Sequence, residues 1–499
     1  MQKTNDKKMA RPPVIAIMGH IDHGKSSLLD YIRKTNIVAK ETGGITQHVS
    51  AYEVEHTTKE GKKGLVTFLD TPGHEAFQAI RARGVEVADI AVLVISGEDG
   101  VKPQTIEAKN HIIKSGIPYI VAITKIDKPE SDVEKTKQSL AESEIYLEGY
   151  GGDIPWIAIS SKTGEGIPAL LDLIILVAEL QELRADPTAS ADGIIIEADV
   201  DPKAGIAASL IIKNGTLRQG DFIVSGSTFA PVRIMQNFLG KSIKEATFSS
   251  PIRIIGFSKL PVAGDTFFCV PSKKEAEEKI LAVKSGAGTR SIIHATEGKV
   301  SLPLVIKTDA SGTLDAIRFE VKKIETEKVE VLIVAADVGA ISENDVKHAM
   351  TYPGTRVLGF NVRVDAQARG AADRTGTIIE TFEIIYKLID RIKGLVAEIT
   401  PKETVDELTG TAKILKIFSR SKDKQILGGR VQEGTLKLGS EVKILRRDAE
   451  IGRGRIRELQ QMKRKAVEAA KDSEFGALIE SKHEIVEGDK IQSFVAIAR

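Results

Sequence analysis

The sequence has little cysteine, little tryptophan and no long apolar run. Cys269 is the one cysteine among 499 residues, and tryptophan also occurs once. One cysteine excludes a disulfide framework and a zinc site built on cysteines, and it suits a reducing cytoplasm. The longest apolar stretch, around residues 170–180, carries Asp172 and Glu179 and is too short to span a bilayer. Because residues 1–13 also lack the apolar core of a signal peptide, we expect a cytoplasmic protein without a membrane anchor.

A strong excess of one charge is missing too. The chain has 70 Lys and Arg against 69 Asp and Glu, which gives a formal net charge of +1. This balance excludes a global polyanion-binding surface, so any nucleic-acid contact must come from local patches. The length predicts about three to five domains with substantial cores.

The clearest motif is a glycine loop directly after the apolar run 14–18. Residues 19–26 read GHIDHGKS and fit the pattern G-x-x-x-x-G-K-[ST], the phosphate-binding loop, although a chance match stays open from the pattern alone. Its backbone N–H groups can point at phosphate oxygens. Lys25 would reach the β- and γ-phosphates, and the Ser26 hydroxyl would hold Mg²⁺. The predicted phosphate site comprises Gly19, His20, Asp22, His23, Gly24, Lys25, Ser26 and Ser27.

Apolar runs alternate with helical patterns up to about residue 183. This alternation predicts a parallel-rich sheet with helices on both faces. Ligands of such folds bind at the carboxyl ends of the strands, where the polar motifs of this chain fall. The predicted strands are Val14–Met18, Leu65–Leu69, Ile90–Ile95, Tyr119–Ile123 and Ile154–Ile159.

Two segments after the loop fit sensors of a γ-phosphate. Asp70 ends a predicted strand, where its carboxylate can join the Mg²⁺ shell, and Gly73 can offer an N–H to the phosphate. Thr46 follows two glycines and can ligate Mg²⁺ only while the γ-phosphate holds its segment, which is an order–disorder switch. Each residue alone also fits ordinary turn chemistry. Their order after a phosphate loop favours the functional interpretation.

Two further strand ends predict guanine recognition. Asp127 can accept hydrogen bonds from N1–H and the N2 amine of guanine, whereas adenine would leave this carboxylate unpaired. The stem of Lys125 would pack on the base. A strand-end Lys and Asp in a solvated loop is the alternative. The predicted base site comprises Thr124, Lys125, Asp127, Ser160, Ser161 and Lys162, with the backbone of the last two meeting the O6 atom.

Five motifs together resemble bacterial translation initiation factor two, a family of translational GTPases, over nearly all of residues 14–499. They are GHIDHGKS, GGITQH, DTPGHEAF, GFNVR (359–363) and EIIYKLID (383–390). The resemblance implies GTP, GDP and Mg²⁺ as ligands, and His74 as the residue that positions the attacking water. It also implies a function: binding initiator tRNA, placing it on the small ribosomal subunit, promoting joining of the large subunit and hydrolysing GTP on the ribosome. Off the ribosome a monomer is expected.

The sequence departs from this family at Thr124, where the family has Asn. Threonine keeps a hydroxyl but lacks the reach of an amide, so guanine binding is expected to be weaker. Two alternative functions stay open. One is an elongation-type GTPase that delivers tRNA; the other is a ribosome-binding module with weak hydrolysis, which only Thr124 favours.

The second half of the chain contains an internal repeat. Residues 214–221 recur as 433–440, and 262–265 recur as 486–489, which predicts two related small β-barrels. Helical spacing of apolar residues from 382 to 396 predicts a long amphipathic helix. The predicted order is a disordered lead-in (1–12), a GTP-binding domain (13–186), a β-barrel (187–285), an α/β domain (286–378), a linker helix (379–396) and a C-terminal β-barrel (397–499).

The C-terminal barrel departs most from the family. The resemblance implies that this barrel binds the formyl-methionyl end of initiator tRNA, in a pocket that usually includes two cysteines. Here the two positions hold Gly429 and Phe475. The expected tRNA site comprises Gly429, Glu474, Phe475 and Gly476. Basic residues between 446 and 465 fit either RNA phosphates or a solvated face, because glutamates are interspersed.

Overall fold

The computed structural model of the chain describes residues 8–33, 49–72, 77–201, 203–284, 299–400, 404–462 and 464–498. The chain divides into two compact units, Met1–Ile399 and Thr400–Arg499. No helix within the described ranges has the length and apolar character that a membrane crossing requires.

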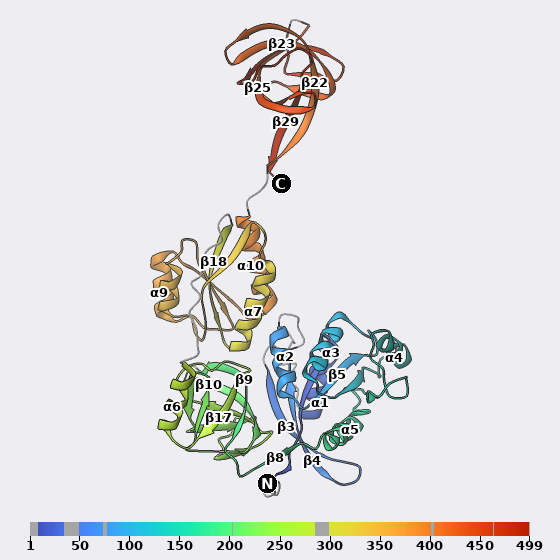
Figure 1. The fold of residues 1–499 in the computed structure, drawn as a ribbon, viewed down its shortest axis with the longest axis vertical. Coiled ribbons are helices and arrows are strands. Elements are labelled where there is room, and N and C mark those ends of the chain that lie inside the picture. Colours follow the sequence, from blue (N-terminus) through green and yellow to red (C-terminus); the bar gives the residue numbers. More distant parts are fainter. Residues whose placement is uncertain are drawn as a thin grey trace. The chain divides into compact units, whose positions relative to one another are not determined.

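The first domain is built on a six-stranded sheet of order β3-β4-β2-β5-β6-β7, parallel except for the pairing of β3 with β4 (Figure 1). The five predicted strands are confirmed. The edge strand β3 was not predicted, although its sequence SAYEVEHT alternates as a half-buried strand does. The strands are β2 (Val14–Gly19), β3 (Ser50–Thr57), β4 (Lys63–Asp70), β5 (Ile90–Ser96), β6 (Tyr119–Thr124) and β7 (Trp156–Ala158).

Helices cover both faces of this sheet, as predicted. Ile15 and Ile17 of β2 belong to the core beneath α1 and α5, whereas Ala16 and Met18 belong to the core beneath α3 and α4. Burial on both faces explains why β2 is apolar throughout. The helices are α1 (Lys25–Arg33), α2 (Gln78–Val87), α3 (Pro103–Ser115), α4 (Val133–Glu142) and α5 (Ile167–Leu180).

The second domain is a seven-stranded antiparallel sheet of order β13-β12-β17-β9-β10-β16-β14 that wraps around its own apolar core. Helix α6 (Lys273–Lys284) packs on β12 and β13. The strands are β9 (Asp192–Asp201), β10 (Gly205–Asn214), β12 (Phe222–Ser225), β13 (Thr228–Pro231), β14 (Ile234–Asn237), β16 (Pro251–Ile255) and β17 (Thr266–Val270), with a separate pair β11 (Thr216–Arg218) and β15 (Glu245–Thr247).

The lead-in is ordered from residue 8 onward, so the prediction of disorder for residues 1–12 is wrong for its second half. Strand β1 (Met9–Ala10) pairs with β8 (Arg184–Ala185). Arg11 then forms a two-pronged ion pair with Asp89, at 2.6 and 2.7 Å. A polar segment is held here by backbone pairing and by a buried partner that lies far away in the sequence.

Asp89 also joins the first two domains. Its carboxylate accepts the Val14 N–H at 2.8 Å and pairs with Lys213 of β10 at 3.0 Å. Nearby, the Thr67 hydroxyl of β4 donates to the Ser249 carbonyl at 2.7 Å. Burial alone would raise the pKa of Asp89, but the Arg11 hydrogen bonds and the Lys213 charge outweigh it, so the pKa lies below its usual value.

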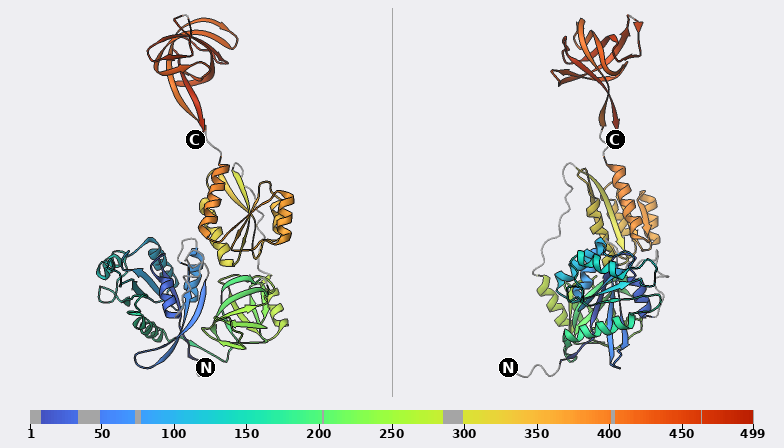
Figure 2. Two further views of the ribbon diagram at one scale, coloured as in Figure 1. Left: turned by 180° about the vertical axis from the view of Figure 1, so that it is seen from behind. Right: turned by 90° about the vertical axis from the view of Figure 1, so that its right-hand side faces the viewer.

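The third domain is a parallel four-stranded sheet of order β19-β18-β20-β21, with helices on both sides (Figure 2). Helices α7 and α10 share one core with the sheet, and α8 and α9 share the other. The elements are β18 (Val300–Thr308), α7 (Ser311–Ile324), β19 (Val329–Val338), α8 (Glu343–Ala349), β20 (Arg356–Phe360), α9 (Ala366–Thr375), β21 (Ile378–Phe382) and α10 (Ile385–Ile399).

The predicted linker helix begins later than expected. Residues 379–382 belong to β21, which pairs with β20, so the helix starts at Ile385 instead of 379. The apolar residues at helical spacing, among them Leu388 and Ile392, are buried in the core of the third domain. The amphipathic pattern therefore describes a packed helix.

The second unit is a closed barrel. Six strands pair in the order β22-β29-β24-β25-β28-β23, and the pairing of β22 with β23 closes the ring. The internal repeat is confirmed locally, since Gly264 and Gly488 both have φ +93° at equivalent turns. The strands are β22 (Thr404–Ser421), β23 (Lys424–Lys437), β24 (Glu441–Arg446), β25 (Ala449–Gln461), β26 (Arg464–Lys465), β27 (Glu468–Ala470), β28 (Glu474–Ser481) and β29 (Lys490–Ala498).

Asp89→Asn is predicted to destabilise the first unit by about 3 kcal/mol at neutral pH, because Arg11 and Lys213 lose the charge that compensates their burial. The low pKa of Asp89 means that its contribution is present above the pKa of an unfolded aspartate and disappears as the pH falls. The difference from the wild type should therefore shrink in acid. Urea unfolding followed by the fluorescence of Trp156 measures both effects.

A matched control is Glu277→Gln, which breaks an exposed ion pair with Lys273 on α6 and should change the unfolding midpoint little. Equal midpoints for Asp89→Asn and the wild type at neutral pH would contradict the structural role of Asp89.

Candidate nucleotide-binding site

The predicted site residues of the first domain lie at one edge of its sheet. The phosphate loop follows β2, Asp70 ends β4, and Thr124 ends β6. The register aligns Ile17 with Asp70, and Gly19 with Val94 of β5. Because these strands are parallel, their carboxyl ends form a single binding edge.

The loop backbone has conformations that its glycines allow. Gly19 has φ +145°, and a Cβ atom there would lie 2.3 Å from the Val94 carbonyl oxygen. Gly24 has φ +87° and Asp22 has φ +60°. These left-handed residues curl the chain just before α1, and a turn of this kind at a helix N-terminus is typical of anion-binding backbone. Ser26 is half-buried in that turn and Ser27 is exposed.

Lys25 and His23 are buried in this loop. The Lys25 ammonium donates to the His20 carbonyl at 2.5 Å. Burial lowers the pKa of Lys25 to about 8, although the nearby Asp70 favours the charged form. Burial, together with the charges of His20 and Lys25, lowers the pKa of His23 to about 4, so the His23 ring is neutral at pH 7. The lysine is therefore the titratable cation at the centre of the loop.

Thr124 supports the loop from below. It is buried, and its hydroxyl donates to the His23 carbonyl at 2.6 Å. The threonine at this position thus fixes the loop backbone without an amide side chain. Although Thr124 stands where the family has Asn, its hydroxyl makes this one specific hydrogen bond to the loop.

Hydrogen bonds connect several residues of the predicted base site through the Ser160 hydroxyl. The Ser160 hydroxyl donates to the Asp127 carboxylate at 2.6 Å and accepts the N–H groups of Lys162 and Thr163. The Ser160 hydrogen bond lowers the pKa of Asp127, so this carboxylate is ionised. An ionised, oriented carboxylate is the acceptor that guanine requires.

Glu98 is a site residue that the sequence analysis missed. It follows β5 and pairs with Lys125 at 2.8 Å and with Lys128 at 2.8 Å. The hydrogen bonds from these lysines lower the pKa of Glu98 to about 2. The pairing with Glu98 fixes the direction of the Lys125 side chain. The available signal was the polar run SGED at the end of a buried strand, the same signal that marked the other strand ends.

Three predicted residues, Thr46, Gly73 and His74, lie outside the described residues. Just before Gly73, the Pro72 carbonyl accepts a hydrogen bond from the buried Arg81 at 3.2 Å, and Arg81 pairs with Glu107 at 2.5 Å. For Mg²⁺, the described donors are the Ser26 hydroxyl and the Asp70 carboxylate. Both are hard oxygen ligands, and this chemistry fits the ion.

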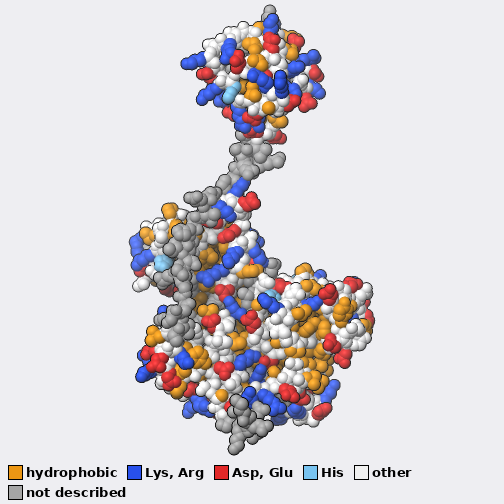
Figure 3. All heavy atoms as spheres, in the orientation of Figure 1, with side chains coloured by type: hydrophobic (Ala, Val, Ile, Leu, Met, Phe, Trp, Pro, Cys, Tyr) orange, Lys and Arg blue, Asp and Glu red, His pale blue; other side chains and the backbone are white. Residues whose placement is uncertain are grey.

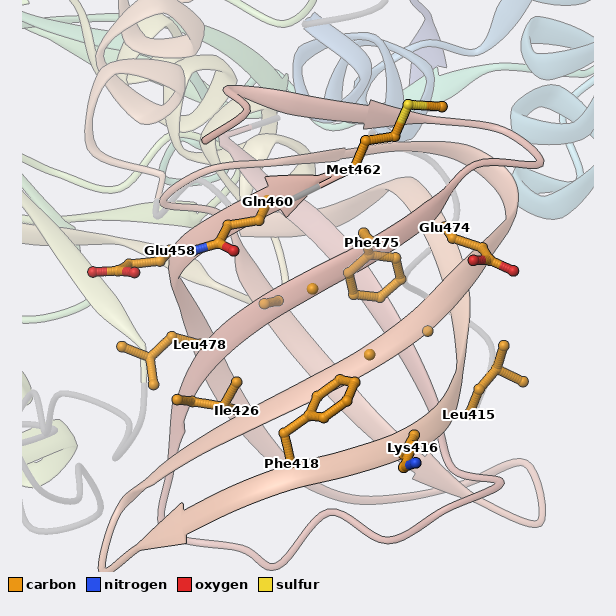
Figure 4. A pocket seen from close by; sticks show the side chains of 14 residues that line it. Leu415, Lys416, Phe418, Ile426, Glu458, Gln460, Met462, Glu474, Phe475 and Leu478 are labelled. Atoms are coloured by element: carbon orange, nitrogen blue, oxygen red, sulfur yellow. The ribbon is translucent and has the colours of Figure 1, made fainter. Parts of the chain in front are cut away.

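The second unit carries a separate pocket of about 530 Å³ that includes all four predicted tRNA-site residues. Figure 4 shows Phe418 and Phe475 in the middle of the lining, with Glu458 and Glu474 at opposite sides. The other lining residues are Leu415, Lys416, Ile426, Gly428, Gly429, Gln460, Met462, Gly476, Ala477 and Leu478. Aromatic rings beside aliphatic side chains suit an apolar or thioether group.

Gly429 and Phe475 are directly opposite each other on β23 and β28. A Cβ atom on Gly429 would lie 2.9 Å from the Phe475 ring and 2.4 Å from the Lys413 carbonyl oxygen. The glycine therefore provides the space that the phenylalanine fills. The two residues that replace the expected cysteines therefore fit each other: the missing side chain of Gly429 leaves room for the Phe475 ring.

Three residues of the basic cluster 446–465 are paired with acids. Arg446 pairs with Asp489, Arg457 with Glu480, and Arg453 with both Glu450 and Asp406. Figure 3 shows side chains of both signs mixed over the visible face of the barrel. The three pairs fit a solvated face, whereas Arg447, Arg464 and Lys465 are exposed and form no ion pair with the described residues, so both interpretations of the basic cluster stay open.

Comparison with known families assigns each domain of the first unit. Residues 11–179 match the family model described as Elongation factor Tu GTP binding domain. Residues 190–270 match Elongation factor G domain 2, and residues 279–393 match Translation-initiation factor 2. The three matches follow the order of the three domains, although the third begins within α6 and ends within α10.

Curated relatives are similar over almost the whole chain. Translation initiation factor IF-2 of Desulforamulus reducens is 40% identical over 99% of this chain and 51% of the relative. The protein of the same name from Persephonella marina is 41% identical over 97% of this chain and 56% of the relative. The chain thus spans a little over half the length of these relatives. A solved structure of GDP-bound aIF5B from Aeropyrum pernix is 28% identical, covers 97% of this chain and 92% of that chain, and has a TM-score of 0.47.

The sheet, the phosphate loop, the Asp70 carboxylate and the Asp127–Ser160 pair, together with the matched GTP-binding domain, define a P-loop protein of the translational GTPase class. Within this class, two observations point to initiation factors: residues 279–393 match Translation-initiation factor 2, and the chain is about 40% identical to proteins of that name along its length. Along nearly its whole length the chain is similar to proteins named Translation initiation factor IF-2, of which it spans a little over half.

Thr124→Val is predicted to weaken nucleotide binding, because the His23 carbonyl loses its hydroxyl donor and the loop is held less firmly. Loss of this buried hydrogen bond should cost about 1–3 kcal/mol of stability. Thr216→Val is the control, since Thr216 is also buried but donates to the Pro187 carbonyl, away from the loop. Titration with a fluorescent GDP analogue should show weaker binding for Thr124→Val only. Equal affinities of all three proteins would contradict the role of Thr124.

The affinity for a phosphate ligand is predicted to fall as the pH rises through about 8. Lys25 loses its proton in this range in the ligand-free protein, whereas a bound phosphate keeps it charged. One linked proton gives a decrease of up to about tenfold per pH unit. Titration with the same analogue between about pH 7 and about pH 8.5 measures the slope. A flat profile would show that Lys25 stays charged without ligand.

Proposed function

We propose that this chain binds GTP and GDP at the carboxyl edge of its first sheet and hydrolyses GTP on the ribosome. The observation that carries the proposal is the Asp127–Ser160 pair, held at strand ends beside the phosphate loop. The loop would bind the phosphates and Asp127 would select the base. A nucleotide bound across both parts would span the strand ends from β2 to β7.

Guanine selection follows from the fixed carboxylate. Asp127 would accept both N1–H and the N2 amine of guanine, and the Lys125 stem, held by Glu98, would cover the base. Adenine presents an acceptor at N1 and no amine at C2. It would therefore leave a charged group unpaired, which a binding site penalises strongly.

The γ-phosphate would be sensed and cleaved by residues next to the loop. Ser26 and Asp70 would hold Mg²⁺, which supplies charge stabilisation to the transferring phosphoryl group. Thr46 would complete the metal shell in the GTP state, and the Gly73 N–H would contact the γ-phosphate. His74 would orient the attacking water for in-line displacement. Loss of the γ-phosphate would release both segments.

We also propose that the chain binds initiator tRNA, promotes its placement on the small ribosomal subunit and assists joining of the large subunit. Relatives named Translation initiation factor IF-2 support this proposal. The pocket of the second unit, with Gly429, Glu474, Phe475 and Gly476 in its lining, is the candidate site for the aminoacyl end. Its apolar rings would suit a methionine side chain.

The two alternative functions have less support. The match of residues 279–393 to Translation-initiation factor 2 argues against an elongation-type factor. The ribosome-binding module with weak hydrolysis was favoured only by Thr124, whose hydroxyl donates to the His23 carbonyl of the loop at 2.6 Å.

The proposal is tested by changing the base-selecting carboxylate. Asp127→Asn should lower GTP affinity by roughly a hundredfold or more, because two hydrogen bonds to a charged acceptor are lost. It should improve binding of xanthosine triphosphate, whose C2 carbonyl can accept from the new amide. Asp153→Asn, an exposed change before β7, is the control. Competition titrations measure both nucleotides; an unchanged preference for GTP in Asp127→Asn would remove Asp127 from the base site.

A further inference from the structure

The third domain has a groove that the proposed function does not use. Its volume is about 460 Å³, and it lies where β20 and β21 end and α10 begins. The family motifs GFNVR and EIIYKLID, which are distant from the phosphate loop, form most of its lining. The lining residues are Asn361, Val362, Arg363, Thr381, Phe382, Glu383, Ile384 and Lys387.

The topology of the sheet favours a ligand at this edge. All four strands are parallel, in the order β19-β18-β20-β21. The chain moves from β18 to β19 on one side and then to β20 and β21 on the other, so its direction reverses between β18 and β20. Ligands of open α/β sheets bind outside the carboxyl ends of strands near such a reversal. The groove adjoins this point.

The wall of the groove is held firmly in place. Asn361 has a left-handed backbone, with φ +50°, directly after β20. Its N–H donates to the Phe382 carbonyl at 2.7 Å, and its side-chain amide donates to Asp309 at 2.5 Å. The Arg363 carbonyl accepts the Ile341 N–H at 2.9 Å. A backbone fixed at both ends presents its side chains in one arrangement, so little order is lost on binding.

The two cations of the groove are available for a ligand. Within the described part of the domain, Arg363 and Lys387 form no ion pair and no side-chain hydrogen bond. On the same helix as Lys387, Arg391 is held by Glu380 at 2.8 Å and Glu398 at 3.2 Å. Glu383 also lines the groove, so cations outnumber carboxylates two to one. The positive end of the α10 dipole lies at the same place.

We propose that this groove binds a phosphate group of an RNA backbone. Arg363 and Lys387 would contact the phosphate, and the exposed Asn361 amide and Thr381 hydroxyl would contact the neighbouring sugar and phosphate oxygens. Such mixed contacts from Arg, Lys, amide and hydroxyl groups are typical of nucleic-acid backbone recognition. An extended strand fits better than a free nucleotide, because Asn361, Arg363, Thr381 and Lys387 are all exposed and none encloses a base.

The test compares two double variants of the full chain with equal loss of charge. Arg363→Ala/Lys387→Ala removes the groove cations. Arg318→Ala/Lys322→Ala removes two exposed cations of α7, which runs from the carboxyl edge of the sheet toward its other edge. Binding of a fluorescein-labelled RNA is measured against salt concentration, with the nucleotide site saturated by GDP. Hydrogen exchange with and without this RNA locates the contact.

The groove variant should bind RNA roughly tenfold more weakly, and the slope of log affinity against log salt should fall by about 2. RNA should protect residues 359–363 and 381–388 in the wild type. The α7 variant should match the wild type, and both variants should bind GDP normally, which separates this proposal from that for the nucleotide site. Equal weakening in both variants would indicate diffuse attraction and overturn the proposal. Protection of these residues by GMP or inorganic phosphate but not by RNA would also overturn it.

Discussion

The carboxyl ends of β2, β4, β5 and β6 meet at one edge of a sheet that is buried on both faces, and the site depends on this constraint. The polar backbone groups at the ends of parallel strands have no partners within the sheet. Loops and helix termini lie at those ends and bind polar ligands there. In this chain those loops carry the phosphate-binding backbone, the Asp70 carboxylate and the Asp127–Ser160 pair. That edge places the glycine loop and the first turn of α1 next to a fixed carboxylate, which is the combination that the proposed nucleotide site needs.

Contacts at the other end of the strands bind this sheet to the second domain. Asp89 precedes β5, receives the Val14 N–H where β2 begins, and is neutralised by Arg11 and Lys213. A buried carboxylate with these partners specifies one way of joining two domains. Thr124 has a similar role at the carboxyl edge, because its hydroxyl, at the end of β6, donates to the His23 carbonyl of the phosphate loop. Both are single polar groups whose bonds link segments far apart in the chain.

Much of this architecture was predictable from sequence, and the exceptions have a common cause. The parallel strands, the glycine loop and the internal repeat follow from local patterns, whereas the expected pocket residues of the last barrel came from the family resemblance. Ordering of Met9–Arg11, pairing of Lys125 with Glu98, and the compensation between Gly429 and Phe475 depend on partners distant in sequence. The helix start at Ile385 was missed because the strand 378–382 has apolar residues that also fit a helical pattern. Pairing with β20 makes these residues a strand, and the helix begins only after it.

The central claim is that the first domain is a guanine-specific phosphate site, and competition between GDP and ADP for the wild-type chain tests it most directly. A fluorescent GDP analogue is bound in the presence of Mg²⁺ and displaced by each nucleotide in turn. The account predicts that GDP displaces the analogue at roughly a thousandth of the ADP concentration or less, because adenine leaves the Asp127 carboxylate unpaired. Displacement by GDP and ADP at equal concentrations would contradict it.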